Sequence, residues 1–205
     1  MKDKTLYLFD LDGVIIDSKS NMEITWNFVN KKFKLNTSFK KYFSLIGRDF
    51  QEILKELKIK NKNFDEIEKI FKYQSVKNFN KYKLYPKVKL ILNKLKSKKI
   101  KIGIVTSKDC HRTKKILSKF SLKFDEVRCS DGKLNGKPRP DKILSIINKL
   151  KIKKKNTVYV GDMIVDKLTA RNAGVEYIHA LYGYSPKKII HKNTIQSFNE
   201  LIEIL

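Results

Sequence analysis

The sequence lacks the features of a secreted or membrane-spanning protein. Its 205 residues include only two cysteines, and no apolar stretch approaches the roughly 20 residues that a membrane-spanning helix needs. The N-terminal segment MKDKTLYLFD has neither the long apolar region nor the small-residue cleavage site of a signal peptide. Cys110 and Cys129 form no CxxC pair and show no metal-ligand spacing. We therefore expect a cytoplasmic protein without membrane contact, in which both cysteines are reduced thiols.

Acidic residues and arginine are also scarce, whereas lysine is abundant. Aspartate and glutamate number 21 against 46 lysines and arginines, giving a net charge of +25, and only 5 of the 46 are arginine. A charge of this size favours anionic partners. Arginine is the better residue for bidentate contacts with phosphate and base edges, however, and the lysines are spread along the whole chain. We therefore expect small anionic metabolites rather than nucleic acid as partners. A biased genome composition would also explain the lysines.

Short apolar runs bounded by turn residues alternate with helical patterns. The runs predict strands buried on both faces, and the patterns predict helices with one apolar stripe. This alternation indicates βαβ units and a doubly wound, Rossmann-like parallel sheet, with the reactive site off the carboxyl ends of its strands. The predicted strands lie within residues 5–10, 100–107, 124–130, 156–162 and 175–181, and the predicted helices within 87–98, 111–121, 141–152 and 166–174.

One region interrupts the alternation. Between about residues 19 and 83 the chain has no convincing buried strand, and helical patterns cover residues 22–33, 49–57 and 64–79. We therefore predict an α/β core domain made of residues 1–17 and 84–205. Residues 18–83 form an all-helical domain inserted into it.

Polar residues stand where the predicted strands end. Asp10 and Asp12 follow the first strand in LYLFDLDGVIIDS, Thr106 and Ser107 end the second, and Asp162 ends the fourth. Because the carboxyl ends of parallel strands meet at one edge of a sheet, these side chains should share a pocket.

Two further residues belong to the same predicted pocket. Lys137 stands in the loop NGKPRPDK, where two prolines restrict the backbone, and Asp166 follows Asp162 by four residues. Clustered carboxylates repel one another unless a cation lies among them, and all-oxygen ligands suit Mg²⁺. A lysine and a hydroxyl beside such a cation would bind phosphate oxygens, and a carboxylate can act as a nucleophile.

Four motifs in order resemble the haloacid dehalogenase superfamily, in its phosphatase branch with a small helical cap. They are DLDGVIIDS, IVTSK, GKPRP and VGDMIVDKLTARNAG, and the resemblance extends from about residue 5 to 183. It implies a Mg²⁺-dependent phosphomonoesterase that forms an aspartyl-phosphate. The implied substrate is a small phosphorylated metabolite, with phosphoglycolate or a sugar phosphate as candidates.

The resemblance also implies a role for each motif residue. Asp10 would be the nucleophile and a Mg²⁺ ligand. Asp12 would be the general acid and base, with its backbone carbonyl on the metal. Thr106 and the backbone N–H of Ser107 would hold the phosphoryl group, while Lys137 would neutralise charge in the transition state.

The remaining implied residues lie around the metal and in the cap. Asp162 would bind Mg²⁺, and Asp166 would orient either the waters of the metal or Lys137. The helical insertion would close over the site and select substrates. Within it Arg48 is a candidate substrate contact, and a solvated residue at a helix start is the alternative reading.

Four other functions are weighed against this one. A phosphosugar mutase resembling β-phosphoglucomutase would share every core motif, so the motifs do not separate it from a phosphatase. A true dehalogenase has no leaving alkoxide to protonate, and Asp12 argues against it. The complete motif set argues against a nonenzymatic binding protein. The positive charge is the only argument for a nucleic-acid end phosphatase. The sequence does not distinguish a monomer from a homodimer.

Overall fold

Six parallel strands form the central sheet of the protein. The computed structural model describes residues 4–185 and 192–203. The strand order is β5–β4–β1–β6–β7–β8, and every neighbouring pair is parallel. The predicted parallel α/β architecture is therefore confirmed, with β1 in the interior of the sheet. The strands are β1 Leu6–Phe9, β4 Lys101–Asp109, β5 Glu126–Ser130, β6 Thr157–Gly161, β7 Glu176–Ala180 and β8 Thr194–Ile195.

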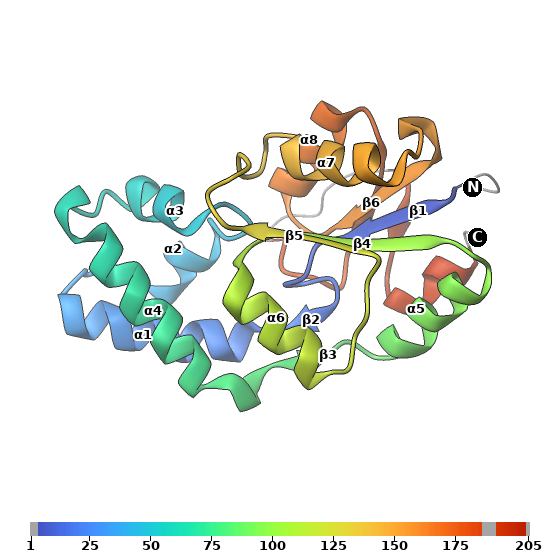
Figure 1. Ribbon diagram of the computed structural model, residues 1–205. Coiled ribbons are helices and arrows are strands. Elements are labelled where there is room, and N and C mark those ends of the chain that lie inside the picture. Colours follow the sequence, from blue (N-terminus) through green and yellow to red (C-terminus); the bar gives the residue numbers. More distant parts are fainter. Residues whose placement is uncertain (1–3, 186–191, 204–205) are drawn as a thin grey trace.

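Helices cover both faces of this sheet, as Figure 1 shows. Successive side chains of a strand point to opposite faces. Tyr7 and Phe9 accordingly pack with apolar residues of α5, α6 and the short C-terminal helix η4. Leu6 and Leu8 pack with residues of α7 and α8 on the opposite face. All four side chains are fully buried, which explains why β1 reads as an uninterrupted apolar run. The helices are α5 Val88–Ser97, α6 Cys110–Lys119, α7 Asp141–Leu150, α8 Ile164–Ala173 and η4 Phe198–Ile202.

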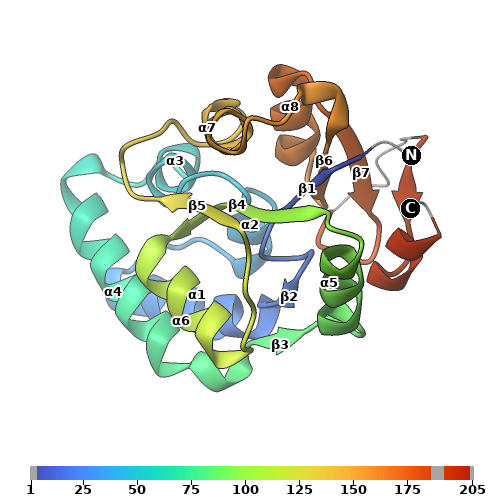
Figure 2. The same ribbon diagram turned by 45° about the vertical axis from the view of Figure 1, so that its right-hand side comes forward.

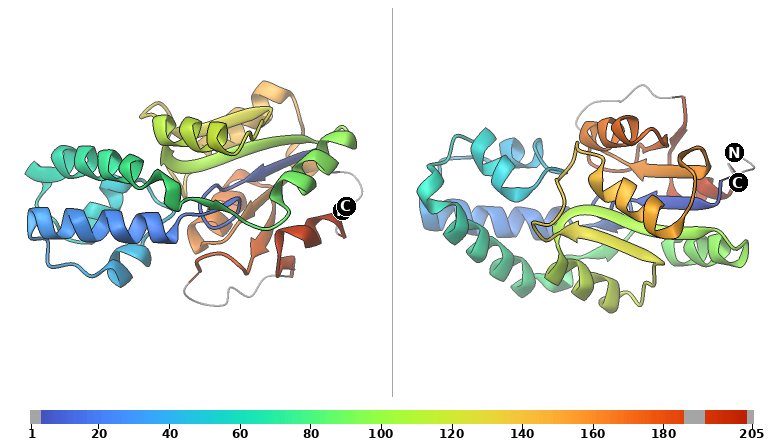
Figure 3. Two further views of the ribbon diagram at one scale, coloured as in Figure 1. Left: turned by 90° about the horizontal axis from the view of Figure 1, so that it is seen from below. Right: turned by 45° about the horizontal axis from the view of Figure 1, so that its top comes forward.

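The helical insertion lies to one side of the sheet, beyond the ends of its strands (Figure 3). It has its own aromatic core, in which the rings of Trp26 and Tyr42 stack with centroids 4.2 Å apart. Met163 and Val165, at the start of α8, join this core and attach the insertion to the sheet domain. Among the described residues, no helix has the length and apolar character of a membrane span. The insertion helices are α1 Lys19–Phe33, α2 Phe39–Phe43, α3 Phe50–Glu56 and α4 Phe64–Lys77.

A two-stranded antiparallel ribbon connects the insertion to the sheet domain, and Figure 2 shows it below the sheet. Its strands are β2 (Ile16–Asp17) and β3 (Lys83–Leu84). The predicted boundaries at 17/18 and 83/84 fall at this ribbon, and the division into two domains stays a prediction. Three short 3₁₀ helices complete the part of the chain that the structure describes: η1 Asn61–Asn63, η2 Phe79–Lys81 and η3 Lys154–Asn156.

The expectation of two reduced thiols is wrong, because Cys110 and Cys129 form a disulfide. Cys110 is the first residue of α6, directly after β4, and Cys129 lies in the neighbouring strand β5. The two strands come together at this point, where Asp109 is paired with Ser130. The cysteines are 19 residues apart in sequence, so only the parallel pairing of β4 with β5 brings them into contact.

Candidate active site

Asp10 and Asp12 stand directly beyond β1, at the edge of the sheet that faces the helical insertion. The backbone N–H of Asp10 donates to the carbonyl of Val160 in β6 at 2.9 Å, which continues the sheet pairing by one residue. The chain then turns at Gly13, whose φ of +87° favours glycine. This turn places Asp12 beside the helical insertion while Asp10 remains buried against the sheet.

Lys137 joins two of the predicted carboxylates. Its ammonium donates to Asp10 Oδ1 at 2.7 Å and to Asp166 Oδ1 at 2.7 Å. All three side chains are buried. Burial alone lowers the pKa of Lys137, but the two carboxylates outweigh it, so the pKa lies above its usual value. Lys137 therefore carries its positive charge next to Asp10 at any physiological pH.

Asp166 has no free oxygen, whereas Asp162 has one. Besides Lys137, Tyr159 donates to Asp166 Oδ1 at 3.0 Å, and the backbone N–H of Met163 donates to Oδ2 at 3.0 Å. Asp162 follows β6, and its Oδ2 accepts from the backbone N–H of Tyr184 at 2.6 Å. Its Oδ1 is buried and accepts no hydrogen bond from the described residues. Asp162 thus presents an unsatisfied acceptor, while Asp166 serves to hold Lys137.

Glycines make room for these two carboxylates. A Cβ at Gly13 would lie 2.2 Å from Asp162 Oδ2, and one at Gly183 would lie 2.3 Å from Asp162 Cβ. A Cβ at Gly161 would lie 2.3 Å from the Cβ of Asp166. Real Cβ atoms essentially never approach so closely, so each position excludes a larger residue.

The site is rich in buried negative charge. Oxygens of Asp10, Asp162 and Asp166 lie within 4.8 Å of one another. Burial raises the pKa of Asp10 to about 7, against the opposing effect of Lys137. Burial and the neighbouring carboxylates Asp166 and Asp10 raise the pKa of Asp162 well above its usual value. A divalent cation among these oxygens would relieve both effects.

Thr106 and Ser107 lie inside β4 rather than at its end, because the strand continues to Asp109. The pairing of β4 with β5 is irregular between Val105 and Asp109. Thr106 is buried, and its Oγ1 accepts from the backbone N–H of Lys108 at 3.1 Å. Ser107 Oγ donates to the carbonyl of Gly47 at 2.8 Å, which joins the strand to the helical insertion.

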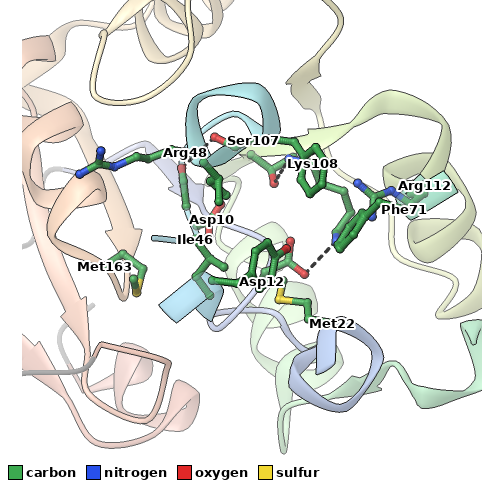
Figure 4. Close-up of a pocket in the computed structure, with 15 residues that line it drawn as sticks. Asp10, Asp12, Met22, Ile46, Arg48, Phe71, Ser107, Lys108, Arg112 and Met163 are labelled. Atoms are coloured by element: carbon green, nitrogen blue, oxygen red, sulfur yellow. Dashed lines mark hydrogen bonds and ion pairs between the residues drawn. The ribbon is translucent and has the colours of Figure 1, made fainter. Parts of the chain in front are cut away.

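A small cavity of about 60 Å³ lies between the sheet domain and the insertion (Figure 4). Asp10, Asp12, Thr106 and Ser107 line it, so the structure brings these predicted residues together. Lys108 and Arg112 also line it, although the sequence reasoning assigned them no role. Strand periodicity could have indicated Lys108, since it follows Thr106 by two residues. The insertion contributes mainly apolar side chains, from Met22, Tyr42, Ile46, Phe50, Ile53 and Phe71.

Arg48 lies at the rim of this cavity, next to Gly47. Its guanidinium is 3.3 Å from a carboxylate oxygen of Glu56, and the two side chains are 40% and 55% exposed. In Figure 4 the Arg48 side chain points away from Lys108 and Arg112. A substrate contact by Arg48 stays a prediction.

Comparisons with known proteins agree with this architecture. The family model described as "Haloacid dehalogenase-like hydrolase" matches residues 7–180. A phosphoglycolate phosphatase from Aquifex aeolicus is 30% identical over 86% of this chain and 84% of its own length. A pyrophosphatase PpaX from Oceanobacillus iheyensis is 25% identical over 82% of this chain and 79% of its own length. The solved structure of a hydrolase from Pseudomonas syringae covers 98% of this chain and 97% of its own, with a TM-score of 0.88 at 20% identity. The chain therefore belongs to the haloacid dehalogenase-like hydrolase family.

Proposed function

We propose that the protein is a Mg²⁺-dependent phosphomonoesterase acting on a small phosphorylated metabolite, either phosphoglycolate or a sugar phosphate. The observation that carries the proposal is the buried Lys137, which bridges Asp10 and Asp166 beside the unsatisfied oxygen of Asp162. A phosphoryl-transfer site needs a nucleophile, a fixed positive charge and a metal ligand in this proximity. Relatives named phosphoglycolate phosphatase and pyrophosphatase support the same class of reaction.

The residues present fit Mg²⁺. Carboxylates of Asp10 and Asp162 and the backbone carbonyl of Asp12 would hold the ion, and the buried Oδ1 of Asp162 would gain the partner that it lacks. Asp166 would not be a direct ligand, because protein donors already occupy both of its oxygens. When bound, the cation would neutralise carboxylate and phosphate charge and polarise the phosphoryl group.

Asp10 is the proposed nucleophile. Its carboxylate attacks phosphorus in line, so an O–P bond to Asp10 forms while the bond to the leaving oxygen breaks. Asp12 gives its proton to that leaving oxygen and later removes a proton from the water that attacks the aspartyl-phosphate. Lys137, Thr106 and the backbone N–H of Ser107 hold the phosphoryl oxygens throughout both steps.

We also propose that residues 18–83 act as a cap over this site. The hydrogen bond from Ser107 to Gly47 and the small cavity support a closed arrangement that excludes bulk water. A cytoplasmic location is part of the proposal. The disulfide between Cys110 and Cys129 weighs against it, because such bonds are rare in reducing compartments.

Replacement of the nucleophile tests the proposal. Asp10→Asn should lower phosphate release from p-nitrophenyl phosphate and 2-phosphoglycolate by at least about a thousandfold, because an amide is a poor nucleophile. The control is Asp65→Asn, an exposed residue in the first turn of α4, which should keep its activity. EDTA should stop turnover by the wild-type enzyme, and Mg²⁺ should restore it. Normal rates in Asp10→Asn, or activity that resists chelation, would contradict the mechanism.

A further inference from the structure

A buried lysine in the cavity has no place in the mechanism above. Lys108 lies in β4, and only 4% of its side chain is exposed. Its Nζ is 3.1 Å from Asp12 Oδ1 and 5.4 Å from the ring centroid of Tyr82. This Nζ donates no hydrogen bond to another of the described residues. A buried ammonium with one ion pair is costly unless another partner completes its shell.

Asp12 likewise lacks a hydrogen bond in this ion pair. Its Oδ1 is buried and accepts no hydrogen bond from the described residues, although Lys108 lies within ion-pairing distance. The two groups therefore compensate each other's charge without the geometry of a hydrogen bond. Either group would exchange this contact for a better partner at little cost. For Lys108 that partner is an anion in the cavity.

Arg112 supplies a second, firmly held cation. Its Nε donates to Asp109, its Nη1 donates to Ser75 Oγ at 3.2 Å, and its guanidinium lies 5.3 Å from the ring centroid of Phe71. Its Nη2 takes part in none of these contacts. In Figure 4 Lys108 and Arg112 lie on the same side of Asp12. The cavity thus offers two positive charges outside the predicted position of the phosphoryl group.

We propose that Lys108 and Arg112 form the subsite for the leaving group, and that this group is small and carries its own negative charge as a carboxylate or a second phosphate. The inference rests on the proposed function and chooses between its two substrate classes. When this anion binds, Lys108 turns from Asp12 to the anion. The Asp12 side chain is then free to contact the leaving oxygen.

The lining of the cavity favours this class over sugar phosphates. The cap side of the cavity is mainly apolar, so the hydroxyls of a sugar ring would lose hydrogen bonds to water without replacement. A small anion needs only the two cations that the cavity provides.

A pair of substrates of similar size tests the charge requirement. 2-Phosphoglycolate carries a carboxylate where 2-hydroxyethyl phosphate carries a neutral hydroxymethyl group. The wild-type enzyme should prefer 2-phosphoglycolate in kcat/KM by at least about 30-fold. In Lys108→Met the loss in kcat/KM should be at least about tenfold greater for 2-phosphoglycolate than for the neutral ester. Lys108→Arg should restore part of the preference, because it keeps the charge.

Lys114→Met is the matched control, since this lysine of α6 is exposed and should leave the preference intact. Pyrophosphate is a third substrate in the same assay. Comparing its kcat/KM with that of 2-phosphoglycolate shows whether the anionic group of the preferred leaving group is a phosphate or a carboxylate. Thermal unfolding of each variant identifies misfolding. If Lys108→Met does not fold, the preference of Lys108→Arg and Arg112→Lys decides the question.

Two outcomes overturn the inference without touching the proposed function. One is a wild-type enzyme that hydrolyses both esters equally well, and the other is an equal loss on both esters in Lys108→Met. If the wild-type enzyme with Mg²⁺ hydrolyses no phosphate ester, the proposed function fails and the inference fails with it.

Discussion

At the scale of single residues, the absence of a side chain at Gly13 matters as much as the carboxylates around it. Gly13 has a φ of +87° and lies so close to Asp162 that a methyl group would overlap its carboxylate. Gly132 has a similar φ of +77°, but nothing lies within 4 Å of the position of its missing Cβ. Adding a Cβ at either position strains the left-handed backbone, but only at Gly13 does it also displace Asp162. Comparing the two substitutions therefore isolates the effect of moving Asp162.

We predict that Gly13→Ala raises the Mg²⁺ concentration needed for half-maximal activity by at least about tenfold, because the new methyl group pushes Asp162 away. Gly132→Ala should leave that concentration unchanged and lower stability by about 1–2 kcal/mol through backbone strain alone. The measurement is a Mg²⁺ titration of phosphate release, with urea unfolding as the measure of stability. Equal Mg²⁺ requirements in the two variants would contradict the assigned place of Asp162 beside the metal.

The sequence predicted the residues that stand at strand ends and missed those identified only by packing. Asp10 and Asp162 are predictable because the carboxyl ends of parallel strands meet at one edge of the sheet, and Lys137 is predictable from the two prolines beside it in its loop. Lys108 is one of 41 lysines, and its spacing of two residues from Thr106 is the one local signal that could have placed its side chain on the same side of the strand. Arg112 lies in a helix whose pattern indicates only an apolar stripe. Its position is fixed by contacts with Ser75 and Phe71 of the helical insertion, which are far away in sequence.

At the scale of elements, β4 and α6 form the wall of the cavity, and the disulfide fixes their junction. Cys110 begins α6 directly after Asp109, whose side chain caps this helix by accepting from the backbone N–H of Arg112 at 2.9 Å. The bond to Cys129 fastens this junction to β5. Both cysteines are partly exposed, so a reductant in solution can reach them.

We predict that the variant with both Cys110→Ser and Cys129→Ser unfolds at a lower temperature than the oxidised wild type. Closing a loop of this length stabilises a protein by about 3 kcal/mol in the chain-entropy model, or roughly 6–12 °C for a chain of this size. Calorimetry with and without dithiothreitol measures the difference. Dithiothreitol should lower the unfolding temperature of the wild type and leave that of the double variant unchanged. Insensitivity of the wild type would show that the bond contributes no stability.

The elements themselves were predictable where apolar residues recur over several positions. Each predicted strand and helix of the sheet domain is present, because burial on both faces or on one stripe leaves a periodic pattern. The missed elements include the five-residue helix α2 and the two-residue strands β2, β3 and β8. Segments this short contain too few residues to show a period, and their neighbours in space determine their structure.

At the scale of the whole molecule, the excess of lysine opposes folding while it attracts substrate. With a net charge of +25, the positive side chains repel one another in the compact state. The electrostatic field of the same side chains raises the local concentration of anionic metabolites. The candidate site lies within this field but is itself lined by carboxylates. The long-range charge can therefore bring a phosphorylated substrate to a pocket whose own carboxylates would repel it.

We predict that moderate salt stabilises the protein. Between 20 and 200 mM NaCl the Debye length falls from about 20 Å to about 7 Å, which screens repulsion among lysines more than it weakens the shorter ion pairs. The unfolding temperature should rise by several degrees over this range and then level off, because the remaining repulsion is already screened. A neutral osmolyte at equal osmolality is the control and should produce no such plateau. A steady rise up to 1 M would indicate general salting-out instead. A fall of the unfolding temperature with salt would show that attraction within ion pairs outweighs repulsion among the lysines. The positions of the lysines would then stabilise the fold.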